Sequence, residues 1–258
     1  MSSNLGLFGW HDMNTADLAT SRDFYCSLFG WTLDAEPRSN GYRMLLDGDS
    51  AFGGMFEWPP EVSQPSRWTG YVLVDDVVEI ARRAQSLGGG YPFESMSIPG
   101  AGTLGFVVDP TGAALTTFRP DIEMTSGAPG PGGSGATVLW NELLTTDLAA
   151  SVAFHQELFG WAVDQSVVDA GGYVIARAHG RPVAGIFQPS TPPGSSDWIT
   201  YFGVENIEET MKRAAEIGGR VVHQATDVPG VGTTAWLLDT NASIFGVMQP
   251  AEGWFARL

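Results

Sequence analysis

The strongest constraint on this chain is an internal repeat. Residues 15–31, TADLATSRDFYCSLFGW, return 130 positions later at 145–161 as TTDLAASVAFHQELFGW, with ten identical positions. Two stretches this similar are expected to adopt the same fold, and a repeat of this period indicates duplicated domains. The sequence of 258 residues therefore reads as two similar halves, each long enough to bury a core of its own.

The boundary between the halves is predicted from composition. Residues 125–136, TSGAPGPGGSGA, hold almost no side chain that could pack in a core. Such Gly, Pro and Ser stretches behave as flexible linkers. We predict a first domain over residues 1–124, a linker over 125–136 and a second domain over 137–258.

Each half shows the same order of elements twice. A strand at 5–14 precedes a helix at 17–29, in which Asp17 is the expected N-cap and Gly30 the expected stop. Three strands follow, and WTGYVLVDD at 68–76 then begins a second strand–helix unit whose helix Asp76 caps. Its three strands are expected at GYPFESM, TLGFVVD and ALTTFRP. The second half repeats this plan, with Asn206 as a helix cap, so the fold class is α+β with four βαβββ units.

This pattern resembles the vicinal oxygen chelate superfamily of glyoxalases, bleomycin-resistance proteins and extradiol dioxygenases. The motifs that carry the resemblance are the helix ending in FGW, the helix start after VDD, and the D-P-x-G turn before the last strand. The tandem arrangement is similar to two-domain glyoxalase-like proteins. The resemblance implies two cupped mixed sheets, each built from two βαβββ units. It also implies that units can pair between chains, so a monomer and a homodimer are both compatible with it.

Metal-dependent members of this family hold a divalent cation with ligands on the first strand of each unit and on the last strand. In the first half the corresponding positions are His11, Thr69 and Thr116, and in the second half they are Asn141, Ile199 and Gly246. One histidine with two threonines is not a credible set of ligands for a divalent metal. We therefore expect no cofactor and no tightly bound catalytic metal, and metal chemistry through unusual ligands stays an alternative.

Two residues are candidates for metal-free chemistry. His11 is a titratable side chain at the head of the first cup, and an imidazole suits proton transfer near neutral pH. Tyr71 could donate a proton to a carbonyl oxygen or hold it. An ordinary structural histidine is an equally good reading of His11. In the second half Asn141 replaces it and could bind a ligand but not transfer a proton.

Aromatic side chains are expected to line both cups and to bind a flat ligand. The alternative for each of them is ordinary core packing. The predicted ligand-binding residues are Phe56, Trp58, Trp68 and Phe106 in the first half, and Asn141, Tyr173, Trp198, Tyr201 and Trp236 in the second half.

Composition restricts the partners. The chain has 13 Lys and Arg against 29 Asp and Glu, a net charge of −16. Such an acidic protein repels phosphate backbones and anionic membrane surfaces, so neither nucleic acid nor a membrane is an expected partner. The N-terminal sequence lacks the pattern of a signal peptide, which favours a cytoplasmic protein.

Three functions fit these features. The first is a metal-independent enzyme, of lyase or isomerase type, that dehydrates, cyclises or isomerises an aromatic or polyketide-like metabolite. The second is a binding protein that sequesters a planar toxic compound, as bleomycin-resistance proteins do in this superfamily. The third is glyoxalase- or dioxygenase-type metal chemistry.

Overall fold

The computed structural model describes residues 4–38, 41–93, 95–121, 138–190 and 194–254. Each half of the sequence forms one mixed sheet. The strands of the first half are β1 Phe8–Thr15, β2 Thr32–Leu33, β3 Arg43–Asp47, β4 Ser50–Glu57, β5 Arg67–Leu73, β6 Met96–Ile98, β7 Gly102–Val108 and β8 Ala114–Pro120. They lie in the order β2-β3-β4-β1-β5-β8-β7-β6. The pairs β1–β4 and β5–β8 are parallel, and they carry the crossover helices of the two βαβββ units.

The second half repeats this topology with one strand fewer. Its strands are β9 Val138–Leu144, β10 Val174–Ala178, β11 Arg181–Phe187, β12 Asp197–Gly203, β13 Arg220–Val228, β14 Gly232–Leu238 and β15 Ile244–Pro250. They lie in the order β10-β11-β9-β12-β15-β14-β13, and β9–β11 and β12–β15 are the parallel pairs. The predicted α+β class with two mixed sheets is confirmed. Three of the four units are βαβββ, and in the third an isolated bridge between Ala162 and Arg177 stands where the first has β2.

The helices begin where the sequence predicts. They are α1 Leu18–Phe29, α2 Val77–Ser86, α3 Leu148–Phe159, α4 Gln165–Asp169 and α5 Ile207–Glu216. Asp17, Asp76 and Asn206 each accept hydrogen bonds from backbone N–H groups of the first turn, so all three predicted caps are confirmed. Gly30 ends α1 in the left-handed conformation, with φ of 77°. Within the described part of the chain, no helix has the length and hydrophobicity that a membrane span requires.

Two local predictions need correction. The strand predicted at residues 90–96 is Met96–Ile98, and Gly90 contributes only an isolated bridge to Val108. Pro92 lies in the predicted stretch, and its missing N–H cannot join a strand ladder. The short helix α4 was not predicted, because its five residues are too few to show a helical period.

Two compact units divide the chain, and each contains segments of both halves. Unit 1 consists of Met1–Trp10, Gly70–Ala128 and Trp140–Ile199, and unit 2 consists of His11–Thr69, Pro129–Leu139 and Thr200–Leu258. The predicted linker over 125–136 lies outside the described residues, so the predicted domain boundaries stay a prediction.

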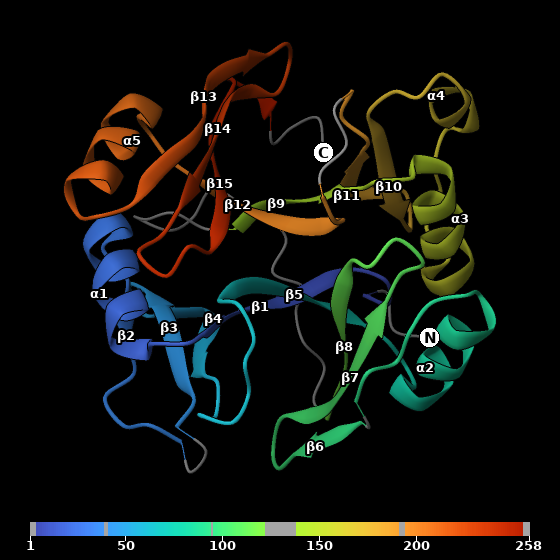
Figure 1. The fold of residues 1–258 in the computed structure, drawn as a ribbon, viewed down its shortest axis with the longest axis horizontal. Helices are drawn as coiled ribbons and strands as arrows, with labels where there is room; N and C mark the ends of the chain where they lie inside the picture. Colours follow the sequence, from blue (N-terminus) through green and yellow to red (C-terminus); the bar gives the residue numbers. More distant parts are fainter. Residues whose placement is uncertain (1–3, 39–40, 94, 122–137, 191–193, 255–258) are drawn as a thin grey trace. The chain divides into compact units, whose positions relative to one another are not determined.

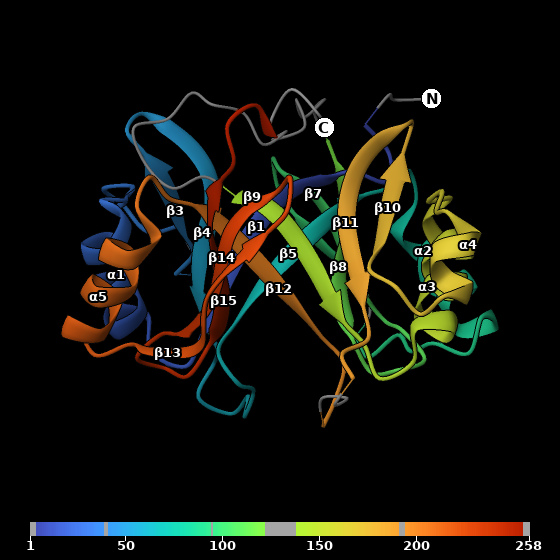
Figure 2. The ribbon, with the colours of Figure 1, turned by 90° about the horizontal axis from the view of Figure 1, so that it is seen from above.

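Helices from different halves pack together inside each unit. In unit 2, α1 lies beside α5, and in unit 1, α2 lies beside α3 (Figures 1 and 2). Two glycines allow this approach. A Cβ on Gly219 would lie 2.8 Å from the ring of Phe24, and a Cβ on Gly89 would lie 2.6 Å from the ring of Phe154. The same phenylalanine of the repeat thus inserts against the other half in both units.

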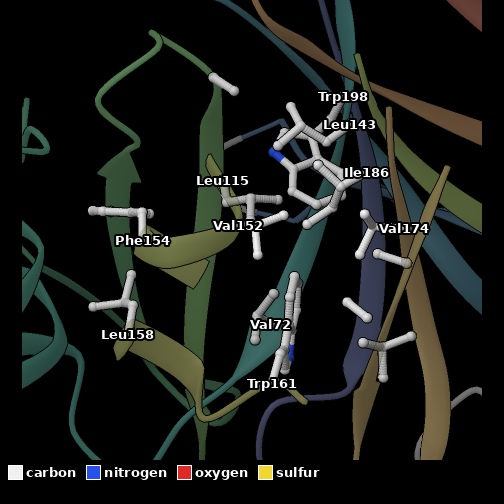
Figure 3. Packing of buried hydrophobic residues seen from close by; sticks show 14 of the residues in the cluster. Val72, Leu115, Leu143, Val152, Phe154, Leu158, Trp161, Val174, Ile186 and Trp198 are labelled. Atoms are coloured by element: carbon white, nitrogen blue, oxygen red, sulfur yellow. The ribbon is translucent and has the colours of Figure 1, made fainter. Parts of the chain in front are cut away.

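The hydrophobic core of unit 1 shows what these helices cover. Side chains of α3 pack with side chains of the strands of both halves (Figure 3). The members labelled in Figure 3 are Val72, Leu115, Leu143, Val152, Phe154, Leu158, Trp161, Val174, Ile186 and Trp198. Burying a side chain of this size contributes about 1.5–3 kcal/mol, so the strands that carry these side chains are held firmly against α3.

One position of the repeat differs inside these cores. His155 in α3 stands where α1 has Tyr25, and both side chains are fully buried. His155 Nδ1 lies 2.8 Å from the Ser151 carbonyl oxygen and donates to it. Burial lowers the pKa of His155, and the nearby Asp109 carboxylate opposes this only in part.

This histidine predicts an acid sensitivity of unit 1. Unfolding exposes His155 and restores its ordinary pKa near ~6.5, so below that pH the unfolded state binds more protons and stability falls. His155→Tyr, which copies the repeat, should show a smaller loss of thermal stability between pH 7.5 and pH 5.5 than the wild type. The reciprocal variant Tyr25→His should show a larger loss. Calorimetric melting curves at both pH values test this, and equal losses in all three proteins contradict it.

Candidate functional site

Helices cover one face of each sheet. We call the opposite face the helix-free face. In unit 2, Met13, Leu45 and Met55 belong to the core that α1 covers. Because side chains alternate along a strand, Asp12 and Asn14 lie on the helix-free face. His11 lies on the opposite face from Asp12, the helix-covered face that also carries Met13. The strand pairing agrees, because His11 pairs with Gly53 of β4, and Gly53 pairs with the core residue Leu45 of β3.

The helix-free face of β1 carries a buried carboxylate with a tyrosine. Asp12 is 4% exposed, and Tyr42 donates its hydroxyl proton to Asp12 Oδ1 at 2.8 Å. Gly54 makes this contact possible, because a Cβ there would lie 2.0 Å from the Tyr42 hydroxyl. The tyrosine therefore lies across the bare backbone of β4 to reach β1.

Polar and aromatic groups continue this surface along β1. Asn14 donates to Thr69 Oγ1 at 3.2 Å and pairs with Phe56 of β4. Trp58 lies against Phe56, with ring centroids 6.1 Å apart and planes at 89°. We call Asp12, Asn14, Tyr42, Phe56 and Trp58 the carboxylate–tyrosine site of unit 2.

The second half repeats the arrangement within unit 1. Glu142 replaces Asp12, and Tyr173 replaces Tyr42. A Cβ on Gly185, the strand partner of Glu142, would lie 1.9 Å from the Tyr173 hydroxyl. Here the hydroxyl oxygen of Tyr173 accepts a hydrogen bond from Trp140 Nε1 at 2.8 Å. Phe187 completes the surface, with its ring centroid 6.0 Å from that of Tyr173.

The last βαβββ unit also joins a tryptophan to a tyrosine. In unit 2, Trp236 Nε1 donates to the hydroxyl oxygen of Tyr201, and a Cβ on Gly246 would clash with the Tyr201 ring. His223 lies over Trp236, with ring centroids 5.0 Å apart. Tyr201 and Trp236, both predicted ligand-binding residues, are therefore neighbours.

Tyr71 lies in unit 1, whereas His11 lies in unit 2, so the two predicted catalytic residues belong to different units. Tyr71 pairs with Thr116, which in turn pairs with Phe106. The Tyr71 ring meets Phe118 edge to face at 6.1 Å. These residues form the helix-free face of β5, β7 and β8, because the alternating Val72, Val107 and Leu115 are in the core.

Three predicted ligand-binding residues lie on helix-covered faces. Trp68 is 3% exposed and contacts Tyr25 and Phe202. Trp198 is 6% exposed and contacts His155. Asn141 alternates with the core residue Leu143 of the same strand. Their roles toward a ligand, like the catalytic roles of His11 and Tyr71, stay predictions.

The sequence alone does not single out Tyr42 and assigns no role to Asp12. A signal for the tyrosine was present, because the first half reads NGY at 40–42 and the second reads GGY at 171–173. Each tyrosine directly precedes a strand, β3 or β10. In both halves the tyrosine follows a glycine and lies over a glycine of the next strand, Gly54 or Gly185. The two tyrosines therefore occupy equivalent positions.

The side chains at the family's metal positions do not fit a divalent cation. Thr69 already bonds to Asn14 through its hydroxyl, and neutral hydroxyls such as that of Thr116 are weak ligands. Among the described residues, no three His, Cys, Asp or Glu side chains gather where they could hold a metal ion.

Comparison with known proteins places the whole chain in one group. Residues 7–116 match the model of the Glyoxalase/Bleomycin resistance protein/Dioxygenase superfamily, and residues 138–253 match that of the Glyoxalase-like domain. The "Putative glyoxylase CFP32" of Mycobacterium bovis is 32% identical over 95% of both chains. The "Anthracycline biosynthesis protein DauV" of a Streptomyces species is 28% identical over 96% of this chain and 95% of its own.

A solved structure shows the same fold. The 2,3-dioxygenase LapB from Pseudomonas sp. KL28 superposes with a TM-score of 0.64, covering 96% of this chain and 94% of its own at 13% identity. The repeated strand–helix units, two family matches in tandem and full-length relatives agree. The chain belongs to the glyoxalase, bleomycin-resistance and dioxygenase superfamily, known as the vicinal oxygen chelate superfamily.

Proposed function

We propose that this protein is a metal-independent enzyme that transfers protons on an aromatic or polyketide-like small molecule, with dehydration, cyclisation or isomerisation as the result. The observation that carries the proposal is the hydrogen bond between Tyr42 and the buried Asp12 on the helix-free face. A carboxylate and a phenol at 2.8 Å can exchange a proton directly. The similarity to an anthracycline biosynthesis protein supports an aromatic polyketide as the class of substrate.

A dehydration illustrates how the pair would act. The Asp12 carboxylate takes a proton from a substrate carbon next to a carbonyl group, and the Tyr42 hydroxyl gives its proton to the leaving hydroxyl group. The proton on Asp12 then passes to the Tyr42 oxygen along their hydrogen bond, so water leaves and the enzyme is unchanged. Phe56 and Trp58 lie farther along the chain from Gly54, and their rings offer aromatic surface to a flat substrate.

Substitution at Asp12 tests this assignment against the alternative at His11. With a substrate found by screening aromatic polyketides by mass spectrometry, Asp12→Asn should lower kcat about 100-fold or more, because general acid–base catalysis contributes that much. His11→Gln should change kcat little, and Asp75→Asn, the same change at an exposed residue, serves as the control. Full turnover by Asp12→Asn together with loss in His11→Gln would return the role to His11.

Gly54 provides a second test that leaves both reacting groups in the sequence. In Gly54→Ala the new Cβ would collide with the Tyr42 hydroxyl, so the tyrosine must leave Asp12. We expect kcat to fall about as far as in Tyr42→Phe, while circular dichroism stays that of the wild type. A Gly54→Ala enzyme with normal kcat would show that Tyr42 need not lie against Asp12.

Metal independence has its own test. Turnover should survive dialysis against EDTA, and added Mn²⁺, Fe²⁺ or Zn²⁺ should not raise it. About one equivalent of a divalent metal per purified chain, lost together with activity on chelation, would support the glyoxalase- or dioxygenase-type alternative instead.

A binding protein is the second candidate, and the aromatic surface of Trp140, Tyr173 and Phe187 favours it. Tight binding of the same aromatic compounds without any product, measured by tryptophan fluorescence and mass spectrometry, would decide for sequestration.

A further inference from the structure

We propose that the helix-free face of the second half, within unit 1, binds an organic cation such as a protonated or quaternary amine. This site is separate from the carboxylate–tyrosine site of unit 2 and goes beyond the proton transfer proposed there. We call its residues, Trp140, Glu142, Tyr173 and Phe187, the aromatic–carboxylate site.

Three aromatic rings from three segments meet at this place. Trp140 comes from β9, Phe187 ends β11, and Tyr173 directly precedes β10. The bond from Trp140 Nε1 to the Tyr173 hydroxyl oxygen holds two of the rings in position. A cation over the face of such rings is attracted by their quadrupoles, and Trp and Tyr are the stronger partners.

A carboxylate accompanies the rings. Glu142 pairs with Gly185, over which the Tyr173 hydroxyl lies. The next pair along these two strands, Leu143 and Ile186, points into the core. Because side chains alternate along a strand, Glu142 points to the opposite face, on which Tyr173 lies. Glu142 is 7% exposed, and a charge pair formed in so sheltered a place is screened less by water and salt than an exposed pair.

A ligand can reach this surface from solvent. Tyr173 is 40% exposed, and Ile175, two residues farther along the same face, is 42% exposed. The helices α3 and α4 lie on one side of β10 and β11 (Figure 2). These exposed side chains show that this part of the face is open to solvent.

The charges around the site favour a cation over an anion. The basic residues of this hairpin, Arg177 and Arg181, lie next to its turn, where Arg177 bonds to the Gly180 carbonyl oxygen. Tyr173 and Phe187 lie at the other end, roughly 15 Å away along the strands. The net charge of −16 adds a field that concentrates cations near the surface.

Choline and its uncharged isostere 3,3-dimethylbutan-1-ol are the probes that test this site. The two differ in charge and hardly in shape, and calorimetric titration of the full chain measures both. We expect choline to bind at least tenfold more tightly, and added salt to weaken choline but not the alcohol. Equal affinities of the two probes would overturn the proposal without any variant.

Matched variants then locate the site. Glu142→Gln should weaken choline binding tenfold or more, Tyr173→Leu should weaken it as well, and Tyr173→Phe should keep it because the ring remains. Asp75→Asn, a charge-removing change at an exposed residue, should leave choline binding unchanged. Unchanged choline binding in Glu142→Gln would overturn the site.

Glu142→Asp provides a check on folding. It keeps the charge and should keep the preference for choline over the alcohol. Suppose that Glu142→Asp melts like the wild type but no longer prefers choline to the alcohol. The charge of the carboxylate would then not be what attracts the cation, and the site would be overturned.

Discussion

In both units, hydrogen bonds join a helix of one half to a turn of the other half. The turns are those that precede β8 and β15, the last strand of each half. In unit 1, Ser151 of α3 donates to Asp109 Oδ2 at 2.9 Å. In unit 2, the Asn241 side chain donates to Ser21 of α1 at 2.9 Å and to Thr15 at 3.1 Å. These groups are buried or partly buried, so breaking one bond leaves an unpaired polar atom. The polar contacts therefore fasten each turn to its neighbouring helix and add to the stability that the hydrophobic cores supply.

The elements that the sequence predicts well are those whose signals are local. Asp17, Asp76 and Asn206 cap helices because a short acceptor side chain precedes an apolar period. The repeat ending in FGW predicts the same helix and stop in both halves, and Gly30 and Gly160 are both left-handed. The order of strands and helices in both halves followed from these signals and from the resemblance to a known family.

The site was harder to predict, because it depends on the face of a strand and on partners far away in sequence. His11 and Asp12 are neighbours, yet they point to opposite faces, and a one-residue error in register exchanges them. Only the pairing of β1 with β4 shows which face α1 covers. Tyr42 reaches Asp12 across 30 positions, and nothing in the local sequence indicates that Gly54 makes room for it.

The exchange of segments between the units makes each half depend on the other for the cover of its helices. A chain of the first half alone would present α1 and α2 with the faces that α5 and α3 cover here. Phe24 would lack Gly219, and its ring would meet water. Such a chain could satisfy both helices at once by pairing with a second copy of itself. In this chain the other half covers those helix faces, and the two equivalent strand positions carry different carboxylates, Asp12 and Glu142.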